Sequence, residues 1–354
     1  MPPKIILNRP LPADKLAGGA ILDKAEKDGL IELVRWEKDS PVDRAWLLEE
    51  LRKGGTDGLL CMHNGEKIND ELLAAAGSSL KVVSTMSAGF DHVDTKALAA
   101  RNVRLGSTPD ALTDATADIG AMLVLMASRR AGEGMRAVLD GKWPTMPWNP
   151  LLLCGHALTE STVGILGFGK IGQTTLKRLL GFGISRALYT TSQVGKPLAP
   201  ERDFANIRAT AEFHGVTLEP AQSYDQLAAE SDFLVLCCPL TDKTKNIVDA
   251  SFLSKMKKTA YVVNTARGPV VDSAALVAAV RAGKLAGAGL DVATGEPNIK
   301  ADDPLVLEQK IVVLPHIGSA TEEARSEMSR HAALNVLAGV GVEGFEWANE
   351  VKLQ

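Results

Sequence analysis

Three polar side chains each follow a predicted strand. Arg267 ends the strand in YVVNTARGPVVD (261–272), Glu296 lies in the loop of GLDVATGEP, and His316 comes directly after IVVLP. A guanidinium fits a carboxylate through parallel N–H donors, and histidine titrates near neutral pH. A neighbouring carboxylate favours the imidazolium and fixes its orientation. These residue types suit a reaction in which Arg267 holds an anion while His316, oriented by Glu296, transfers a proton.

Each of the three also has a plainer interpretation. Taken singly, an arginine after a strand is more often a surface or salt-bridge residue, and a histidine after proline is usually a loop residue. Glu296, before Pro297, equally suits a solvated loop. The functional interpretation depends on shared position, because ligands of a parallel sheet gather at the carboxyl ends of its strands.

The segment VGILGFGKIGQ (163–173) predicts a nucleotide site. Gly167, Gly169 and Gly172 match G-x-G-x-x-G directly after an apolar strand and at the start of a helical run. Glycines at this spacing permit a tight turn, admit a pyrophosphate close to backbone N–H groups and let the helix pack on the strand. The alternative is a glycine-rich turn without a ligand. In this strand–turn–helix context we predict a dinucleotide cofactor.

The next strand, RALYTTS, bears on which dinucleotide is preferred. An NAD site usually has a carboxylate at the end of this strand, where it binds the adenosine ribose. Here Thr190, Thr191 and Ser192 follow Tyr189, and the next carboxylate is Glu201. Hydroxyls can bond to a 2′-phosphate, and no carboxylate is present to repel it. The sequence therefore predicts NADP (NADPH), with NAD as the alternative.

The rest of the chain alternates short, apolar, β-rich runs with helical patterns. The predicted strands are PKIILN, IELVRW, GLLCM, LKVVSTM, NVRLGS, STVGILG, RALYTT, GVTLE, DFLVLCC, TAYVVNT, AGAGLDV and KIVVLP. Helices are predicted over 12–29, 42–55, 110–130 and 321–340. This alternation predicts an α/β fold with two parallel-sheet domains, each covered by helices on both faces. Tryptophans and prolines crowded into 143–150 indicate an irregular link between the domains.

Length, composition and charge limit the class of protein. The 354 residues suit two domains, and 45% hydrophobic with 23% charged residues is typical of a globular chain. The formal net charge is −4 and no long Lys/Arg run is present, so we predict no nucleic-acid partner. The longest uncharged apolar run, 119–128, is too short to span a bilayer, and the N-terminus MPPKIILNRP lacks the apolar core of a signal peptide.

The cysteines point to a reducing compartment. Cys61, Cys154, Cys237 and Cys238 show no C-x-x-C spacing, and the last two are adjacent in an apolar run. We expect all four to pack as small hydrophobic side chains, and we predict no metal site. Together with the absence of a predicted membrane segment, this favours a cytoplasmic protein.

At these motifs the sequence resembles the D-isomer-specific 2-hydroxyacid dehydrogenases. The matching segments are SAGFDHVD (87–94), VGILGFGKIG, SYDQLAAESDFLVLCCPLTDKT (223–244), VVNTARGPVVD, AGLDVATGEP and LPHIGSAT. The resemblance covers most of the chain from about residue 55 to 335. Within that family, LCGHALTESTVGI and LYTTSQ are most similar to the glyoxylate/hydroxypyruvate reductases. The ordered set of motifs is far more specific than any single one.

The resemblance implies that the two domains bind different ligands. It implies an NAD(P)-binding Rossmann domain over 110–320 and a discontinuous substrate-binding domain formed by 1–109 and 321–354, with a cleft between them. Arg267, Glu296 and His316 are implied as the catalytic trio. Ala88 and Gly89 are implied to offer backbone N–H groups to the substrate carboxylate. Family members are usually dimers through the cofactor domains, and Trp148 matches a tryptophan that reaches into the partner's active site.

The resemblance further implies which residues line the cofactor. Besides the three glycines, these are Phe168, Lys170, Ile171, Thr190, Thr191, Ser192, Cys238, Pro239, Thr244, Thr265, Asp291, His316 and Gly318. Simple core packing is the alternative for Cys238. Asp118, in TADIG, departs from the glutamate that is usual in the family, so it receives no role.

These features together predict NAD(P)H-dependent reduction of a small 2-oxo acid, glyoxylate or hydroxypyruvate, to the D-2-hydroxy acid. One alternative is a phosphoglycerate-type dehydrogenase, which would need further cationic residues for the phosphate. Another is a nucleotide-sensing scaffold like the C-terminal-binding-protein co-repressors, which grip peptides on the same fold. Measurable turnover separates the reductase from the scaffold.

Overall fold

A computed structural model describes residues 1–62 and 67–353, which divide into two compact units. Unit 1 consists of Met1–Leu112 with Ala320–Gln354, and unit 2 of Thr113–Ser319. The sequence placed these boundaries at 109/110 and 320/321. The chain therefore leaves unit 1 after its fifth strand and returns to it with the long C-terminal helix.

Unit 1 is built on a six-stranded sheet of order β13-β5-β4-β3-β1-β2. Its strands are β1 (Lys4–Leu7), β2 (Glu32–Arg35), β3 (Thr56–Cys61), β4 (Val82–Thr85), β5 (Arg104–Gly106) and β13 (Glu350–Val351). Its helices are α1 (Ala17–Lys27), α2 (Arg44–Arg52), α3 (Asp70–Ala76), α4 (Thr95–Ala100) and α13 (Glu322–Val340), with a 3-10 turn η1 (Gly77–Ser79). All pairs are parallel except β13 with β5, which is antiparallel. The sequence did not predict β13, because two residues give no apolar run.

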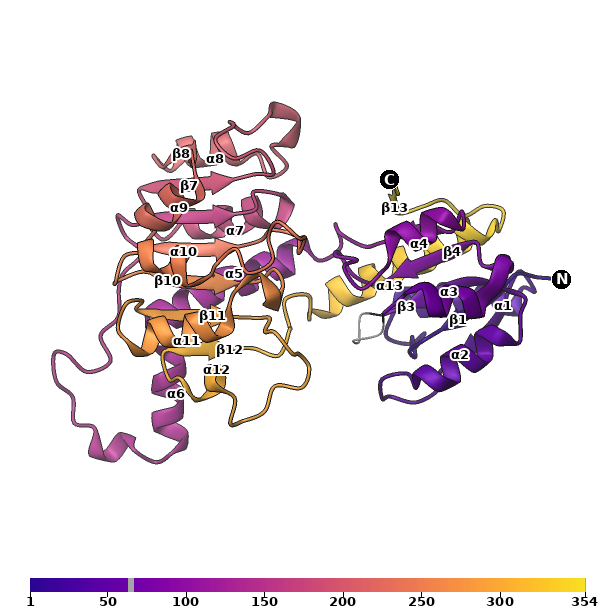
Figure 1. Cartoon of the computed structure of the whole chain (residues 1–354), viewed down its shortest axis with the longest axis horizontal. Coiled ribbons are helices and arrows are strands. Elements are labelled where there is room, and N and C mark those ends of the chain that lie inside the picture. Colours follow the sequence, from indigo (N-terminus) through magenta and orange to yellow (C-terminus); the bar gives the residue numbers. More distant parts are fainter. Residues whose placement is uncertain (63–66, 354) are drawn as a thin grey trace. The chain divides into compact units, whose positions relative to one another are not determined.

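Helices cover both faces of this sheet. One face packs on α2, α3 and α4, through Leu47, Leu72 and Leu98. The other packs on α1 and α13 (Figure 1). A Cβ at Gly339 of α13 would lie 2.6 Å from Val82, so the glycine lets this helix approach the sheet closely. The predicted C-terminal helix is confirmed, and it completes the core of the N-terminal segment.

Unit 2 is built on a seven-stranded parallel sheet of order β12-β11-β10-β9-β6-β7-β8. Its strands are β6 (Thr162–Leu166), β7 (Arg186–Thr190), β8 (Thr217–Pro220), β9 (Phe233–Leu236), β10 (Tyr261–Asn264), β11 (Gly287–Leu290) and β12 (Ile311–Val313). Its helices are α5 (Thr113–Ser128), α6 (Ala131–Leu139), α7 (Lys170–Leu180), α8 (Ile207–Phe213), α9 (Tyr224–Glu230), α10 (Ala250–Lys255), α11 (Ser273–Arg281) and α12 (Pro304–Leu307). The 3-10 turns are η2 (Trp143–Thr145), η3 (Pro200–Arg202) and η4 (Gly268–Val270). All seven strands predicted for this half are confirmed.

The two faces of this sheet form separate hydrophobic cores. In β9, Leu234 and Leu236 face the core shared with α9, α10 and α11, whereas Phe233 and Val235 face the core shared with α5, α7 and α8. Burial on both faces explains why these strands read as continuous apolar runs. Because all its strands run in the same direction, their carboxyl ends lie on one side of the sheet, which we call the carboxyl edge.

The prediction that 143–150 links the two domains is wrong. This segment lies inside unit 2, and the chain passes between units at Leu112/Thr113 instead. The reason is that α5 packs against α7 and the strands of unit 2, so the chain enters this unit before the aromatic segment begins. The segment after α6 extends from unit 2 as a loop (Figure 1).

The expected burial of the cysteines holds for three of the four. Cys61 and Cys238 are buried and Cys237 is half-buried, and burial raises the pKa of Cys61 to about 12. Cys154 is exposed, so its predicted packing in a core is wrong. Its thiol instead donates to the carbonyl of Pro150, within the loop before β6. Among the described residues, no helix has both the length and the apolar character that crossing a bilayer requires.

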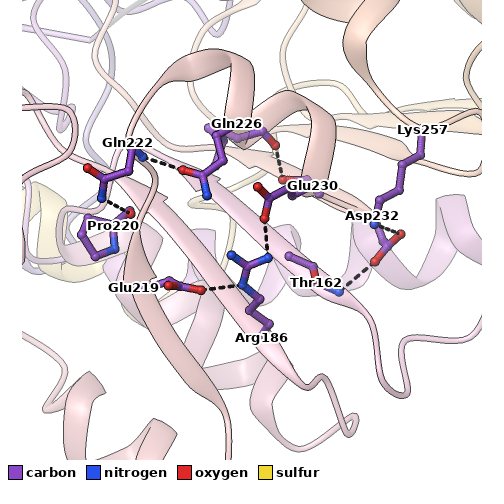
Figure 2. Close-up of polar contacts among 11 residues, drawn as sticks. Thr162, Arg186, Glu219, Pro220, Gln222, Gln226, Glu230, Asp232 and Lys257 are labelled. Carbon is purple, nitrogen blue, oxygen red and sulfur yellow. Dashed lines mark hydrogen bonds and ion pairs between the residues drawn. The ribbon is translucent and has the colours of Figure 1, made fainter.

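Charged side chains join β7, which lies next to the edge strand β8 of the unit 2 sheet, to its neighbours (Figure 2). Arg186 of β7 donates to Glu219 of β8 at 2.5 Å and also pairs with Glu230 at the end of α9. The hydrogen bond from Arg186 lowers the pKa of Glu230. A carboxyl whose folded-state pKa is lowered stabilises the protein above its unfolded pKa, and this contribution is lost as the pH falls through the folded value.

We expect Arg186→Met to lower the free energy of unfolding by about 0.5–1 kcal/mol at pH 7, a small loss because the side chains are partly exposed. The loss should shrink as the pH falls below the ordinary glutamate pKa of 4.5, because Glu230 is then protonated first in the unfolded state and, at still lower pH, in the folded state as well. Urea unfolding at pH 7 and at pH 4 measures the difference. Lys255→Met, which removes one exposed pair with Asp225 of α9, is the matched control. A loss from Arg186→Met no larger than the control's, or independent of pH, would contradict the network's contribution.

Candidate active site

The glycine-rich turn after β6 has the geometry of a phosphate cradle. Gly167 has φ +99, and a Cβ there would lie 2.5 Å from the backbone nitrogen of Cys238, so only glycine fits the turn. A Cβ at Gly172 would lie 2.4 Å from the carbonyl oxygen of Gly167, where helix and turn are in contact. A Cβ at Gly169, in contrast, would meet no atom within 4 Å. The open space therefore lies at the glycine whose backbone must face the ligand.

The start of α7 supplies donors to this open space. Gly169 caps the helix without a side-chain hydrogen bond, and the first N–H groups of a helix have no partner within it. Phe168 is buried and stacks on Tyr189 at 4.3 Å, so only its backbone can face a ligand. Lys170 is exposed and Ile171 half-buried. The turn therefore fits the pyrophosphate of a dinucleotide through backbone N–H groups and the helix dipole.

The end of β7 borders the same turn. The carbonyl of Thr190 accepts hydrogen bonds from the N–H groups of Gly167 and Phe168 at 3.1 and 2.9 Å. Thr190 is buried, whereas Thr191 is half-buried and Ser192 is exposed. The hydroxyl of Thr191 bonds to the backbone of Gln193. Of the three predicted hydroxyls, Ser192 is the most accessible.

The segments after β9 and β10 close the other side of the turn. Cys238 is buried, and burial raises the pKa of its thiol to about 12, so it stays a neutral thiol. Thr244 donates to the carbonyl of Pro239 at 2.6 Å and thereby closes its own loop. Thr265 is buried and donates to the carbonyl of Leu236 at 3.3 Å. These side chains hold the backbone at the carboxyl edge of the sheet.

Arg267 lies at this same edge, directly after β10. The buried Asn264 accepts from the N–H of Ala266 and donates to the carbonyl of Arg267, each at 2.9 Å, which fixes the turn that follows the strand. The next residue, Gly268, is in backbone contact with the segment after β11, since a Cβ there would lie 2.2 Å from the carbonyl carbon of Ala293. The turn that carries Arg267 therefore packs on the loop that carries Glu296.

Glu296 and His316 form a direct pair. The Nδ1 atom of His316 lies 3.0 Å from Oε1 of Glu296. The other carboxylate oxygen, Oε2, accepts from the N–H of Ala293 at 3.0 Å. Because both oxygens are held, the carboxylate presents a fixed acceptor to the imidazole. The structure thus brings Glu296 and His316 together, on the loops after two neighbouring strands.

Asp291, at the end of β11, holds the histidine loop. Its carbonyl accepts from the N–H of His316 at 2.9 Å, and its two carboxylate oxygens accept from the N–H groups of Ile317 and Gly318, both at 2.8 Å. Burial raises the pKa of Asp291, and the two backbone hydrogen bonds oppose that shift. His316 has φ +54, in the left-handed region that side chains other than glycine seldom adopt. The three hydrogen bonds stabilise this conformation.

The comparisons with known proteins agree on one family. The family model described as "D-isomer specific 2-hydroxyacid dehydrogenase, NAD binding domain" matches residues 121–318. The chain is 41% identical to a glyoxylate reductase/hydroxypyruvate reductase from Homo sapiens over 352 residues, which cover 99% of this chain and 98% of that protein. The chain belongs to the D-isomer-specific 2-hydroxyacid dehydrogenase family.

Further relatives are similar to this dehydrogenase over nearly its whole length. A glyoxylate reductase from Thermococcus onnurineus is 38% identical and covers 96% of the chain and 93% of its own. A solved glyoxylate reductase from Paecilomyes thermophila has a TM-score of 0.81 at 28% identity, covering 99% and 98% of the two chains. An NADPH-dependent glyoxylate/hydroxypyruvate reductase from Sinorhizobium meliloti, solved with NADP and malonate, has a TM-score of 0.77 at 28% identity, covering 99% and 97%.

Two residues of this dehydrogenase's site are not predicted from the sequence. In the sequence, Asn264 is only the end of an apolar strand, and Gly268 is only the residue after Arg267. A single polar residue that closes the buried run YVVN is the signal that marks Asn264. Asp291 is predicted as a cofactor residue, whereas the structure gives it a second task, that of holding the histidine loop.

Three of the four residues predicted to bind the substrate do not belong to this edge, whereas the fourth, Arg267, does. Ala88 and Gly89 belong to unit 1, in the loop after β4, and both are half-buried. Trp148 belongs to unit 2, on the loop after α6, and its side chain is 83% exposed. Unit 2 therefore brings the Glu296–His316 pair, Arg267 and the glycine-rich turn to the carboxyl ends of the strands of one sheet.

We expect Asp291→Asn to lower kcat by about 10- to 100-fold, because the carboxamide nitrogen cannot accept from a backbone N–H and the His316 loop loses one anchor. The free energy of unfolding should fall by about 1–3 kcal/mol. Steady-state kinetics and urea unfolding measure the two effects. Asp232→Asn is the control, since Asp232 also accepts from a backbone N–H, that of Thr162, but at the opposite edge of the sheet. Equal kcat values for the two variants would contradict the role of Asp291.

Proposed function

We propose that this dehydrogenase catalyses NAD(P)H-dependent reduction of glyoxylate or hydroxypyruvate to glycolate or D-glycerate. The observation that carries the proposal is the Glu296–His316 pair, 3.0 Å apart, at the sheet edge that also bears Arg267 and the glycine turn. This edge combines a proton donor, a cation for a carboxylate and a turn for a dinucleotide. The relatives named glyoxylate reductase support the choice of substrate.

The three side chains have separate tasks in this reaction. Arg267 holds the substrate carboxylate, which orients the adjacent carbonyl as well as attracting the anion. His316 donates a proton to the carbonyl oxygen, and Glu296 stabilises the imidazolium and fixes its ring. The reduced nicotinamide, when bound, supplies the hydride that goes to the carbonyl carbon. Proton and hydride together convert the 2-oxo acid to the 2-hydroxy acid, and the imidazole is left neutral.

In this proposal the two units have different tasks. We assign substrate binding to unit 1, where the N–H groups of Ala88 and Gly89 bind the carboxylate, and cofactor binding to unit 2. We keep the domain boundaries predicted from the sequence, which are 1–109 with 321–354 for substrate binding and 110–320 for cofactor binding. Cys238, Pro239, Thr244 and Thr265 border the cofactor through the backbone that they hold.

NADPH is the preferred cofactor in this proposal. Ser192 is exposed at the end of β7, and no carboxylate follows that strand before Glu201. A 2′-phosphate there meets hydroxyls and no repelling charge. The Sinorhizobium meliloti relative is NADPH-dependent, which supports the same preference here.

A second copy of the chain is the partner that unit 2 suits best. Large apolar side chains are exposed on α6 and the loop after it: Met135, Val138, Leu139, Trp143, Trp148 and Leu151. Apolar surface gathered in this way is typical of a protein interface. We propose a homodimer through this region, with Trp148 contributing to the partner's site, and a cytoplasmic location consistent with four free cysteines.

We expect Leu139→Glu to convert the dimer to a monomer, because an unpaired carboxylate in an apolar interface is unfavourable. Light scattering after gel filtration should then give the 37.6 kDa of one chain and not twice that mass. Phe213→Glu is the control. Phe213 is also apolar and 86% exposed, but it lies on α8, which packs beside the edge strand β8, and not on α6 or the loop after it. A wild-type protein that runs as a monomer would contradict the proposal.

The function is tested by oxidation of NADPH and NADH with glyoxylate, hydroxypyruvate, pyruvate and phenylpyruvate. We expect turnover with the first two acids and a higher kcat/KM with NADPH than with NADH. Negligible turnover with every acid, while NADPH still binds, would favour a nucleotide-sensing scaffold. A preference for NADH would contradict the cofactor assignment alone.

Variants of the trio complete this test. His316→Ala should lower kcat by roughly two to four orders of magnitude with NADPH binding retained, because the proton donor is lost. Arg267→Ala should raise KM and lower kcat, because binding and orientation both fail. Glu296→Gln keeps an acceptor for the imidazole but removes the charge, so its kcat should lie between those of the wild type and His316→Ala. Unchanged turnover in His316→Ala would exclude it as the proton donor.

A further inference from the structure

The loop that follows β4 in unit 1 is tightly held at both ends. The N–H of Met86 donates to the carbonyl of Cys61, and the N–H of Ile68 donates to the carbonyl of His92, each at 2.9 Å. In the middle, the carbonyl of Ser87 accepts from the N–H of Thr108 at 2.9 Å. The loop therefore has a defined backbone path between β4 and α4.

Inside this loop, side chains form a continuous line of hydrogen bonds. The Nε2 atom of His92 lies 3.1 Å from Oγ1 of Thr85, and this oxygen lies 2.8 Å from Oγ of Ser87. Ser87 in turn donates to the carbonyl oxygen of Gly89 at 2.7 Å. The side chains of Thr85, Ser87 and His92 are all buried, at 0%, 9% and 8% exposure. Burial limits the competition of solvent for these hydrogen bonds.

The direction of the line follows from counting protons. Ser87 has one hydroxyl proton, which it gives to the carbonyl of Gly89, so Thr85 must donate to Ser87. The single proton of Thr85 is then used, so His92 must donate to Thr85 through Nε2–H. The line therefore runs one way, from His92 to the carbonyl of Gly89, and every oxygen in it has a donor.

The end of the line bears on the two N–H groups assigned to the substrate. A carbonyl oxygen carries partial negative charge and repels a carboxylate, and here the carbonyl of Gly89 is bound by Ser87. Within residues 1–62 and 67–353, the N–H groups of Ala88 and Gly89 donate to no acceptor. The loop thus has its acceptor occupied and its donors available, which is the arrangement an anion requires.

We propose that Ser87, Thr85 and His92 are positioning residues for substrate binding, which hold the Gly89 carbonyl so that the N–H groups of Ala88 and Gly89 face the substrate carboxylate. The inference rests on the proposed function, in which those N–H groups bind a 2-oxo acid. None of the three side chains takes part in the chemistry itself. Their loss should therefore change substrate affinity much more than it changes turnover at saturation.

Ser87→Ala tests the last bond of the line. We expect KM for glyoxylate to rise roughly tenfold, as for the loss of about one hydrogen bond, with kcat within about threefold and KM for NADPH unchanged. The inhibition constant of oxalate, a dicarboxylate of similar size that cannot be reduced, should rise by a similar factor. Ser84→Ala is the matched control, because Ser84 is its near neighbour, is also buried and donates to the carbonyl of Ala332 in α13.

Thr85 separates a positioning role from a packing role. Thr85→Val keeps the shape but removes the hydroxyl, so it should raise KM for glyoxylate as Ser87→Ala does. Thr85→Ser keeps the hydroxyl and should restore KM to within about twofold of the wild type. A purely structural effect would follow the lost methyl group, and Thr85→Ser would then be the more damaging change.

The outcomes distinguish this inference from the function on which it rests. Wild-type protein that reduces no 2-oxo acid overturns the proposed function, and the inference with it. Normal wild-type turnover, with KM for glyoxylate equal in Ser87→Ala, Ser84→Ala and the wild type, overturns the inference alone. Melting temperatures and NADPH binding establish that each variant is folded, so a raised KM reports on the loop.

Discussion

The candidate site depends on one buried carboxylate at the end of a strand. Asp291 binds three successive N–H groups, those of residues 316–318, through its carbonyl and both carboxylate oxygens. Without these bonds the left-handed backbone of His316 would be unfavourable, and its imidazole would not be held against Glu296. The pairing of proton donor and carboxylate is thus a consequence of how the strand before it ends. Asp291 is buried at a cost that its hydrogen bonds offset.

Close approach between segments that follow neighbouring strands is the second constraint. The glycines at 167, 268 and 318 each lie where a Cβ would come within 2.2–2.8 Å of a neighbouring atom. Each contact joins loops that follow neighbouring strands or the turn between strand and helix. Glycine is required there because any side chain would separate these loops and the polar groups they carry. The small edge of the sheet can therefore hold a guanidinium, a carboxylate and an imidazole at once.

The two units use the same device to prepare a backbone for a ligand. In unit 2, the side chains of Asn264 and Asp291 bind the backbone next to Arg267 and His316. In unit 1, Ser87 binds the carbonyl of Gly89. In each case a buried polar side chain near the end of a strand holds a peptide group rather than a ligand. Residues of this kind fix the geometry of a site without contacting the substrate, since a locked backbone loses little entropy on binding.

The order of residues alone was enough to predict the parallel-sheet architecture, the glycine turn and the identity of the three polar residues that follow strands. It was enough because strands buried on both faces read as apolar runs and because G-x-G-x-x-G has a local steric cause. The same reasoning placed the segment 143–150 between domains, missed β13 and took Asp291 for a cofactor ligand alone. The pairing of Glu296 with His316 was also predicted, and the structure brings the two side chains together, whereas these other points emerged only from the packing of the folded chain. They depend on which distant segments meet, and periodicity along one segment carries no information about its partners in space.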